Sequence, residues 1–328
     1  MPHTLVVRSE TWPIRGSFRI ARGAKTAADV VVAEIADGQA TGRGECVPYP
    51  RYGETSASVI AEIEALRPAI VAGLTRKELP GLLRAGAARN ALDCALLDYE
   101  AKATGRTAAE LLGLPRPALV RTAFTLSLDT PEAMAKAAAV AALTYRTIKL
   151  KIAGAGDLER VEAVRRAAPN ARLIADANEG WSVDDLHRLT PELAGLGVRL
   201  IEQPLKAGED DALLGFESPV PLCADESCHT RADLPRVLGR YSHINIKLDK
   251  AGGLTEALAL AREATAARLT LMIGCMVSTS LSIAPAMLLA RFADFVDLDG
   301  PLLLARDRIP SLAYRGDELL PPAAELWG

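Results

Sequence analysis

The chain has 328 residues, of which 49% are hydrophobic and 24% charged, and its formal net charge is −3. This length exceeds one ordinary core of about 150 residues, so we expect a barrel together with a smaller domain. The near-neutral charge argues against nucleic acid as a partner, and no run of about 18 apolar residues predicts a membrane span.

The first 118 residues predict an α+β domain. Residues 1–10 contain no apolar region of the kind that a signal peptide needs. Segments 3–9 and 29–36 are typical of antiparallel strands, and 81–103 predicts a long helix with one apolar stripe. Within that helix, Arg89 and Asp93 are interpreted as polar residues that serve packing.

From about residue 119, short β-like runs alternate with amphipathic helical runs such as 131–142 and 254–267. This alternation predicts right-handed βαβ units and a parallel sheet. Eight strands in roughly 180 residues favour a barrel over an open sheet. The predicted strands are 121–128, 147–152, 172–177, 199–204, 222–226, 243–248, 270–275 and 295–299.

No eighth barrel helix is predicted after Asp299. Residues 301–328 contain prolines and short apolar runs, and we expect this tail to return to the first domain. The predicted organisation is therefore an α+β domain over 1–118, a barrel over 119–300 and a tail over 301–328.

The second predicted strand, T-I-K-L-K-I at 147–152, places Lys149 and Lys151 on one face. Their ammonium groups would project roughly 7 Å apart along the strand. One explanation is an edge strand whose lysines face solvent. The other explanation is a functional site, and it depends on the residues that end the other strands.

Polar side chains end the predicted strands at a similar phase, one βα unit apart. The carboxyl ends of barrel strands meet at one mouth, where barrel enzymes keep their sites, so we expect these side chains to converge there. They are Lys149, Lys151, Asp176, Glu202, Asp225, Lys247, Asp297 and Asp299.

Three of these residues, Asp176, Glu202 and Asp225, are carboxylates on neighbouring strands. Ionised carboxylates do not gather without a cation, and ligands made only of oxygen suit a hard divalent ion, with Mg²⁺ first. The alternative is that each carboxylate caps the helix or turn after it. Three carboxylates at one phase, flanked by lysine-bearing strands, favour one metal ion per chain.

Lys151 and Lys247 would then face each other across the acidic group. A lysine is protonated at neutral pH, but a nearby cation and the ammonium of Lys149 would lower its pKa toward the roughly 7–8 of a general base. This arrangement suits abstraction of a proton next to a carboxylate, with the metal stabilising an enediolate.

The same residues carry a resemblance to the enolase superfamily, muconate-lactonizing subgroup. Over nearly its whole length the chain is most similar to the L-Ala-D/L-Glu epimerases of Gram-negative bacteria. The resemblance implies a (β/α)7β barrel under an α+β capping domain. It also implies Mg²⁺-dependent, two-base epimerisation of a dipeptide, used in murein peptide recycling. The stretches that carry it are K-L-K at 149–151, E-Q-P at 202–204, A-D-E-S-C-H-T-R at 224–231, N-I-K-L-D-K-A-G-G-L at 245–254, G-E-C-V-P-Y-P-R-Y-G-E at 44–54 and A-G-A-A-R-N-A-L-D-C-A-L at 85–96.

The resemblance also implies a role for each site residue. Lys151 and Lys247 would be the acid/base catalysts, and the three carboxylates would bind Mg²⁺. Lys149 would assist with the substrate carboxylate. Asp297 and Asp299 would hold the free α-ammonium of the dipeptide, for which a carboxylate pair on one strand face is a sound receptor. The alternative explanation of Asp297 and Asp299 is an acidic pair that flanks a turn.

Three further residues are candidates for substrate contacts. Thr125 and Cys275, at the ends of the first and seventh strands, either line the pocket or fill the barrel core. Arg22 would receive the side-chain carboxylate of a glutamate, with Arg19 and Lys25 as alternatives, or else is a solvated surface arginine.

Two other kinds of protein could carry the same site residues. An N-acylamino acid racemase or o-succinylbenzoate synthase of the subgroup acts on a substrate without a free ammonium, which leaves Asp297 and Asp299 without a partner. A non-catalytic, metal-dependent binding protein would not need two opposed lysines. We expect a small dipeptide as substrate, no nucleic acid or membrane partner, and a homo-oligomer. Five scattered cysteines without a CxxC pair predict reduced thiols and a cytoplasmic location.

Overall fold

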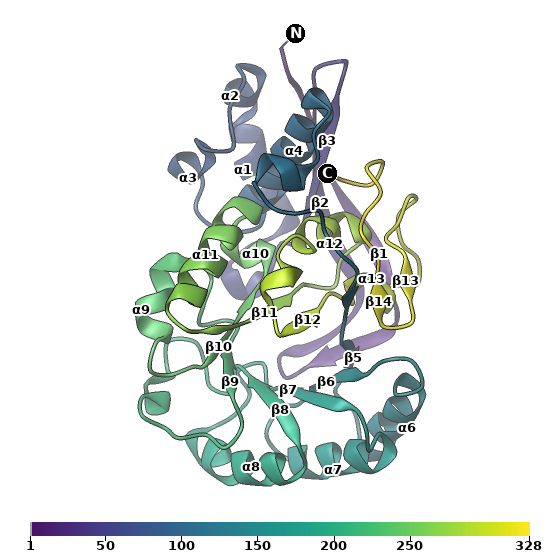
Figure 1. Cartoon of the computed structure of the whole chain (residues 1–328), viewed down its shortest axis with the longest axis vertical. Helices are drawn as coiled ribbons and strands as arrows, with labels where there is room; N and C mark the ends of the chain where they lie inside the picture. Colours follow the sequence, from purple (N-terminus) through teal and green to yellow (C-terminus); the bar gives the residue numbers. More distant parts are fainter. Residues whose placement is uncertain (1) are drawn as a thin grey trace.

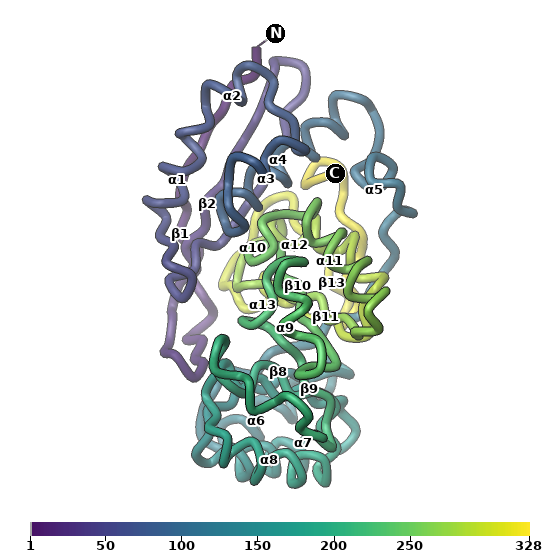
Figure 2. The backbone as a smooth tube through the Cα atoms, turned by 90° about the vertical axis from the view of Figure 1, so that its left-hand side faces the viewer, coloured from purple at the N-terminus to yellow at the C-terminus, as the bar shows by residue number. Residues whose placement is uncertain are grey.

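The computed structural model describes residues 2–328. It contains a three-stranded antiparallel sheet in the first fifty residues, an eight-stranded parallel sheet, and a small three-stranded sheet formed near the end of the chain. Figure 1 shows the first sheet and its helices above the parallel sheet, and Figure 2 shows the first two strands running down one side of it. Among residues 2–328, no helix is both long enough and apolar enough to cross a membrane.

The N-terminal sheet is built on one long hairpin. The predicted strands 3–9 and 29–36 are the paired halves of β1 and β2, and the pairing resumes after an irregularity between Pro13 and Phe18 and continues to Ile20 and Gly23. The predicted helix over 81–103 begins later, at Ala87, because Gly86 has a φ of +147° and lies outside the helical region. The elements are β1 (Thr4–Ile20), β2 (Gly23–Ala36), β3 (Thr41–Cys46), η1 (Pro50–Tyr52), α1 (Ser56–Ala65), α2 (Arg67–Val71), α3 (Leu79–Leu82), α4 (Ala87–Thr104) and α5 (Ala108–Leu111).

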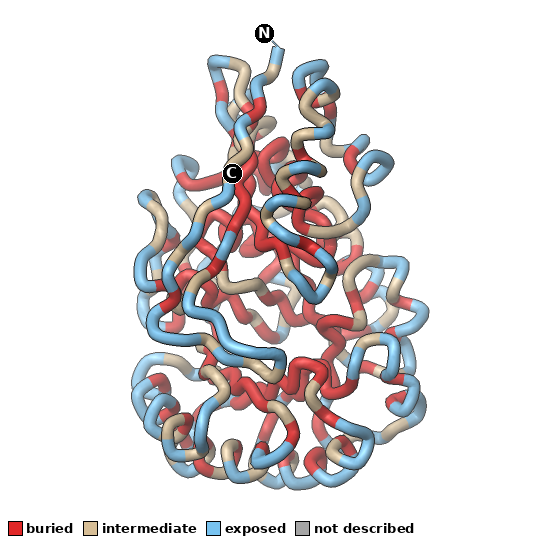
Figure 3. The backbone as a smooth tube through the Cα atoms, turned by 180° about the vertical axis from the view of Figure 1, so that it is seen from behind, coloured by how far each residue is buried: buried red, intermediate tan, exposed pale blue. Residues whose placement is uncertain are grey.

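Helix α4 packs closely on β3 because that strand carries glycines where the two backbones meet. A Cβ atom added to Gly44 would lie 2.1 Å from the carbonyl oxygen of Ala91, and one added to Gly42 would lie 2.2 Å from that of Ala95. The apolar face of α4 and the inward face of the sheet therefore form one core. In Figure 3 the buried stretches of the chain lie toward the inside of the molecule.

Replacing Gly44 by alanine is expected to reduce the free energy of unfolding by about 1–3 kcal/mol, because the atom that blocks the new methyl group belongs to a helix backbone. Urea unfolding measures this change. Gly81→Ala is the matched control, since a Cβ atom there meets nothing within 4 Å. Equal stability of the Gly44→Ala variant and the wild type would contradict the packing described.

The eight predicted barrel strands are all present, and their neighbours pair in parallel in chain order. The backbone N–H of Ala123 donates to Val296 O at 2.8 Å, which brings the first and last strands together. The sheet is thus a nearly closed barrel, and the predicted fold class is confirmed. The strands are β5 (Phe124–Leu126), β6 (Thr147–Lys151), β7 (Arg172–Asp176), β8 (Val198–Glu202), β9 (Leu222–Ala224), β10 (His243–Ile246), β11 (Thr270–Gly274) and β12 (Phe295–Asp297).

An α-helix lies between each pair of consecutive barrel strands except β8 and β9. Between β8 and β9 the described chain forms only the 3₁₀ turn η2 (Asp211–Leu213). After β12, the last barrel strand, the helix that follows is the one-turn helix α13 (Gly300–Leu303). The remaining connecting elements are α6 (Pro131–Ala141), α7 (Asp157–Ala167), α8 (Val183–Gly195), η3 (Arg231–Asp233), α9 (Leu234–Val237), α10 (Leu248–Ala251), α11 (Leu254–Ala266), α12 (Ser280–Ala286) and η4 (Ala290–Phe292).

The end of the chain contacts both β4 (Val120–Arg121), which directly precedes the barrel, and helix α4. Strands β13 (Tyr314–Arg315) and β14 (Glu318–Leu319) form a small sheet with β4. The backbone N–H of Gly328 donates to Asp98 Oδ1 at 2.7 Å, and the indole N–H of Trp327 donates to Cys94 O at 3.1 Å. The last residues therefore pack against α4.

Candidate active site

A cavity of about 420 Å³ lies between the hairpin β1–β2, the segment around Tyr49 and the carboxyl ends of the barrel strands. This is the mouth at which the sequence predicted a site. Asp176 and Glu202 are fully buried and do not line the cavity. The predicted site residues that do line it are Arg22, Thr125, Lys149, Lys151, Asp225, Lys247, Cys275, Asp297 and Asp299.

Lys149 lies among three carboxylates. Its Nζ atom is 3.0 Å from Asp176 Oδ2, 2.7 Å from Glu202 Oε2 and 2.8 Å from Asp297 Oδ2, and its side chain is 1% exposed. Strand β6, which carries it, is hydrogen-bonded to β5 on one side and β7 on the other. The edge-strand explanation of the two lysines is therefore wrong.

The two lysines proposed as bases reach the acidic group from different strands. Lys151 Nζ lies 2.5 Å from Asp176 Oδ2, and Lys247 Nζ lies 2.7 Å from Asp225 Oδ2. Lys247 directly follows β10 and immediately precedes α10, so it stands two strands beyond Glu202 on β8. The structure thus brings Lys151 and Lys247 to one cavity, with the carboxylates beneath them.

The lysine pKa values follow these contacts. Burial lowers the pKa of Lys247, but the charges of Asp225 and Glu202 outweigh burial and raise it above its usual value. Burial lowers the pKa of Lys149 as well, and its carboxylate neighbours raise it in the same way. The lowered pKa expected from the sequence depended on a cation bound beside the lysine, whereas the charges nearest to Lys247 in this arrangement are carboxylates.

The carboxylates themselves differ in proton affinity. Burial raises the pKa of Asp176, but Lys149 and Lys151 outweigh burial and bring it below the usual range. Burial and the charge of Asp176 raise the pKa of Glu202, and the charges of Lys149 and Lys247 offset this only in part. The carboxylate of Asp176 therefore holds a proton less tightly than that of Glu202.

The three carboxylates fit a hard divalent cation by chemistry. They end adjacent strands, with Asp176 directly opposite Glu202 in the ladder between β7 and β8. Glu202 Oε2 and Asp225 Oδ1 are buried without a hydrogen bond, although lysine ammonium groups lie 2.7 Å from each. Among residues 2–328, no three His, Cys, Asp or Glu side chains form a preassembled metal-ligand cluster. Lysine ammonium groups are the cations that lie beside these two oxygens.

The acidic pair from the end of the barrel stands beside Thr125. Asp299 Oδ2 accepts a hydrogen bond from Thr125 N at 2.6 Å, and Asp297 Oδ1 accepts one from Thr125 Oγ1 at 3.3 Å. Strand β12 ends at Asp297, so Asp299 is not on the predicted strand 295–299 but precedes α13. Burial and the charge of Asp297 raise the pKa of Asp299 to about 7. Cys275 lines the same end of the cavity.

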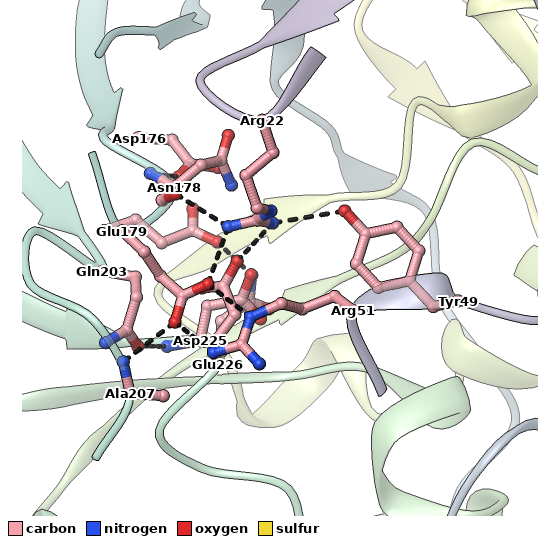
Figure 4. Close-up of polar contacts among 12 residues, drawn as sticks. Arg22, Tyr49, Arg51, Asp176, Asn178, Glu179, Gln203, Ala207, Asp225 and Glu226 are labelled. Atoms are coloured by element: carbon pink, nitrogen blue, oxygen red, sulfur yellow. Dashed lines mark hydrogen bonds and ion pairs between the residues drawn. The ribbon is translucent and has the colours of Figure 1, made fainter. Parts of the chain in front are cut away.

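Arg22 stands at the tip of the β1–β2 hairpin and reaches the barrel (Figure 4). Its Nη1 atom donates to Glu179 Oε2 at 2.9 Å, and its Nη2 atom donates to Glu226 Oε1 at 2.7 Å. Arg51 donates to both carboxylate oxygens of Glu179, at 2.7 and 2.8 Å. Of the alternatives to Arg22, Lys25 lines the cavity and lies 5.1 Å from the centre of the Tyr49 ring.

Two family models match the chain. Residues 3–113 match the N-terminal domain of mandelate racemase / muconate lactonizing enzyme, and residues 132–308 match the enolase C-terminal domain-like family. The chain belongs to the enolase superfamily. The resemblance predicted from the sequence is therefore confirmed.

Curated relatives of this superfamily member are similar over nearly their full length. The L-Ala-D/L-Glu epimerase of Escherichia coli (strain K12) is 49% identical, with 96% of this chain and 99% of that protein covered. The N-acetyl-D-glutamate racemase of a Pseudoalteromonas species is 46% identical, with 91% and 95% covered. Both relatives act on compounds that their names describe as derivatives of glutamate.

Solved structures of superfamily members are similar as well. An enolase family member from Agrobacterium tumefaciens with homology to dipeptide epimerases, with bound sodium and L-Ala-L-Glu, is 51% identical with a TM-score of 0.97, and both chains are covered completely. The dipeptide epimerase of Enterococcus faecalis V583, complexed with Mg and L-Leu-L-Tyr, is 30% identical with a TM-score of 0.92, covering 100% of this chain and 99% of that chain.

Several residues at this site were not predicted from the sequence. Asn178 and Glu179 follow Asp176 with φ values of +47° and +69°, and Asn is a residue that tolerates this region, which is the only local signal. Lys250 is buried, with Nζ 2.7 Å from Asp225 Oδ1, and also donates to Asn245 O at 2.9 Å. Glu226 came directly after a predicted ligand without being singled out.

Proposed function

We propose that this protein is a Mg²⁺-dependent dipeptide epimerase that interconverts L-Ala-L-Glu and L-Ala-D-Glu. The observation that carries the proposal is one cavity in which Lys151 and Lys247 stand above three buried carboxylates. The named activities of the Escherichia coli relative and the dipeptides bound in related structures support it. Murein peptide recycling is the process in which such a dipeptide would arise.

The reaction moves one proton at the α-carbon of the second residue. One lysine, as the free amine, takes the α-proton from one face, and the ammonium of the other lysine returns a proton to the opposite face. Asp176, Glu202 and Asp225 would hold Mg²⁺, which supplies positive charge that stabilises the enediolate form of the substrate. Lys149 assists at the substrate carboxylate.

The remaining cavity residues would bind the rest of the dipeptide. Asp297 and Asp299 receive the α-ammonium, with Thr125 holding both carboxylates in place. Cys275 lines that end of the cavity. Arg22 receives the side-chain carboxylate of glutamate by exchanging one of its present carboxylate partners, and Lys25 is the alternative cation.

The direct test is isotope exchange. The purified protein is incubated in D₂O with Mg²⁺ and a panel of dipeptides, and deuterium at the α-carbon of the second residue is followed by NMR. Exchange and inversion with L-Ala-L-Glu are expected. A panel without any exchange would contradict the proposal.

Replacing Asp299 by asparagine is expected to reduce kcat/KM for L-Ala-L-Glu by about 10–100-fold. A charge-assisted hydrogen bond contributes about 1.5–3 kcal/mol, and each 1.36 kcal/mol is a factor of ten. Asparagine retains an oxygen that accepts from Thr125 N, so the fold around the site is preserved. Steady-state kinetics measure the loss.

N-acetylation of the dipeptide should cause a similar loss in the wild type and little further loss in the Asp299→Asn variant. Two changes to one contact do not add, whereas changes to separate contacts do. Equal rates of the wild type on free and acetylated dipeptide would show that the acidic pair does not bind the ammonium.

Racemisation of N-acylamino acids is the second candidate function. It is favoured by the 46% identity to a protein named N-acetyl-D-glutamate racemase. The pairing of Asp297 with Lys149 and the pKa of about 7 at Asp299 also reduce the negative charge that an uncharged acyl group would meet. Comparison of kcat/KM for L-Ala-L-Glu and N-acetyl-L-glutamate decides between the two.

Three broader features complete the proposal. Residues 1–118 form the capping domain, 119–300 the catalytic barrel, and 301–328 a tail that returns to the cap. The protein acts in the cytoplasm on a small dipeptide. It assembles as a homo-oligomer, for which light scattering is the direct measurement.

A further inference from the structure

Helix α4 of the N-terminal part lies beside α10 and α11 of the barrel, as Figures 1 and 2 show. Arg89 on α4 donates from Nη2 to Ala251 O at 2.7 Å and from Nε to Gly252 O at 3.1 Å. These carbonyl groups end α10, the one-turn helix that begins directly after Lys247. The guanidinium therefore caps the far end of the turn that carries Lys247 at its start.

A second contact holds the middle of the same turn. Asn90 Nδ2 donates to Asp249 Oδ1 at 2.8 Å, and the backbone N–H of Val47 donates to the same oxygen at 2.9 Å. Asn90 and Asp249 are 1% and 4% exposed, so water does not compete for these bonds. Asp249 stands two residues after Lys247 and is held entirely from the N-terminal part of the chain.

A third contact holds the start of the next helix. Asp93 accepts from Thr255 N at 2.9 Å and from Thr255 Oγ1 at 2.5 Å, at the first turn of α11. Gly252 and Gly253 make the approach possible. A Cβ atom on Gly252 would lie 2.4 Å from Arg89 Nε, and one on Gly253 would lie 2.4 Å from the Cβ atom of Asp93.

We propose that Arg89, Asn90 and Asp93, the α4 clamp, are positioning residues for Lys247. The inference rests on the proposed two-base reaction. Among residues 2–328, no hydrogen bond joins α4 to β6, which carries Lys151. The clamp therefore sets the position of one base and leaves the other to the barrel.

The test uses the stereochemical asymmetry of the reaction. Lys247→Ala first identifies which epimer Lys247 deprotonates. In Arg89→Met and Asn90→Ala, α-proton exchange into D₂O from that epimer is expected to slow by about 10–100-fold, the cost of displacing a reacting group by about 1 Å. Exchange from the other epimer, which depends on Lys151, should stay within about twofold of the wild type.

Asp98→Asn is the matched control. Asp98 is a buried carboxylate on the same helix and accepts from Arg43 N and Gly328 N, away from α10. It should leave the ratio of the two exchange rates unchanged, even where it lowers stability.

The ratio of the two exchange rates decides the inference. Equal slowing of both epimers in the clamp variants, or slowing of neither, would overturn it. Should Arg89→Met fail to fold, the smaller change in Asn90→Ala decides by the same ratio. A wild-type enzyme that exchanges neither epimer of any dipeptide would overturn the proposed function itself, and the clamp inference with it.

Discussion

Replacement of Lys151 or of Lys247 by alanine is expected to slow epimerisation by about 10²–10⁴-fold, the usual contribution of a positioned acid or base. Each lysine lines the cavity, and each lies on a different side of the carboxylate group. Inversion needs a proton removed from one face and another delivered to the opposite face, so neither lysine alone completes it. Initial rates in both directions measure the loss.

Each variant should still exchange the α-proton of one epimer. In Lys247→Ala, Lys151 continues to remove and return the proton on its own face, and the reverse holds for Lys151→Ala. Lys206→Ala is the control, because that side chain is 64% exposed and pairs with Glu209 at the surface. Either variant epimerising at the wild-type rate would show that the two-base assignment is wrong.

Removal of divalent ions by EDTA is expected to reduce turnover by at least about 10³-fold, since a Lewis acid at such a site contributes several kcal/mol. Addition of Mg²⁺ in excess should restore the rate. Circular dichroism in EDTA checks that the loss is not unfolding, which the lysine–carboxylate contacts should prevent. Full turnover after exhaustive chelation would contradict the metal requirement.

The Glu202→Gln variant locates the ion. It keeps the size of the side chain and removes one charge from the proposed ligand set, so the Mg²⁺ concentration at half-maximal rate should rise by about tenfold or more. Glu217→Gln, an exposed residue, is the matched control. An unchanged Mg²⁺ dependence in Glu202→Gln would place the ion elsewhere.

Most of the barrel was predictable from the sequence because each strand leaves a local pattern. The run 147–152 was predicted as a strand, and β6 covers Thr147–Lys151. By contrast, the second half of β1 was missed, although Trp12, Ile14, Phe18 and Ile20 alternate with other residues, because Pro13 and Gly16 within the run argue against a strand. Only the backbone pairing with β2 makes that segment a strand.

The grouping of the site residues was also predictable. Lys151, Asp176, Glu202, Asp225 and Lys247 recur about one βα unit apart. Strands that repeat in parallel bring equivalent positions to one mouth of the barrel. Sequence spacing therefore determined which side chains meet, without any knowledge of distances.

What the tertiary structure alone decided is how those side chains are paired. Arg22 bonds to Glu226 across 204 positions of sequence, and Arg89 bonds to Ala251 across 162. The raised pKa of Lys247 likewise depends on which carboxylates lie nearest in space. The pattern along a chain reports which face a residue occupies, because that follows from local backbone geometry. The partner it meets there depends on how whole elements pack, and no local pattern records that.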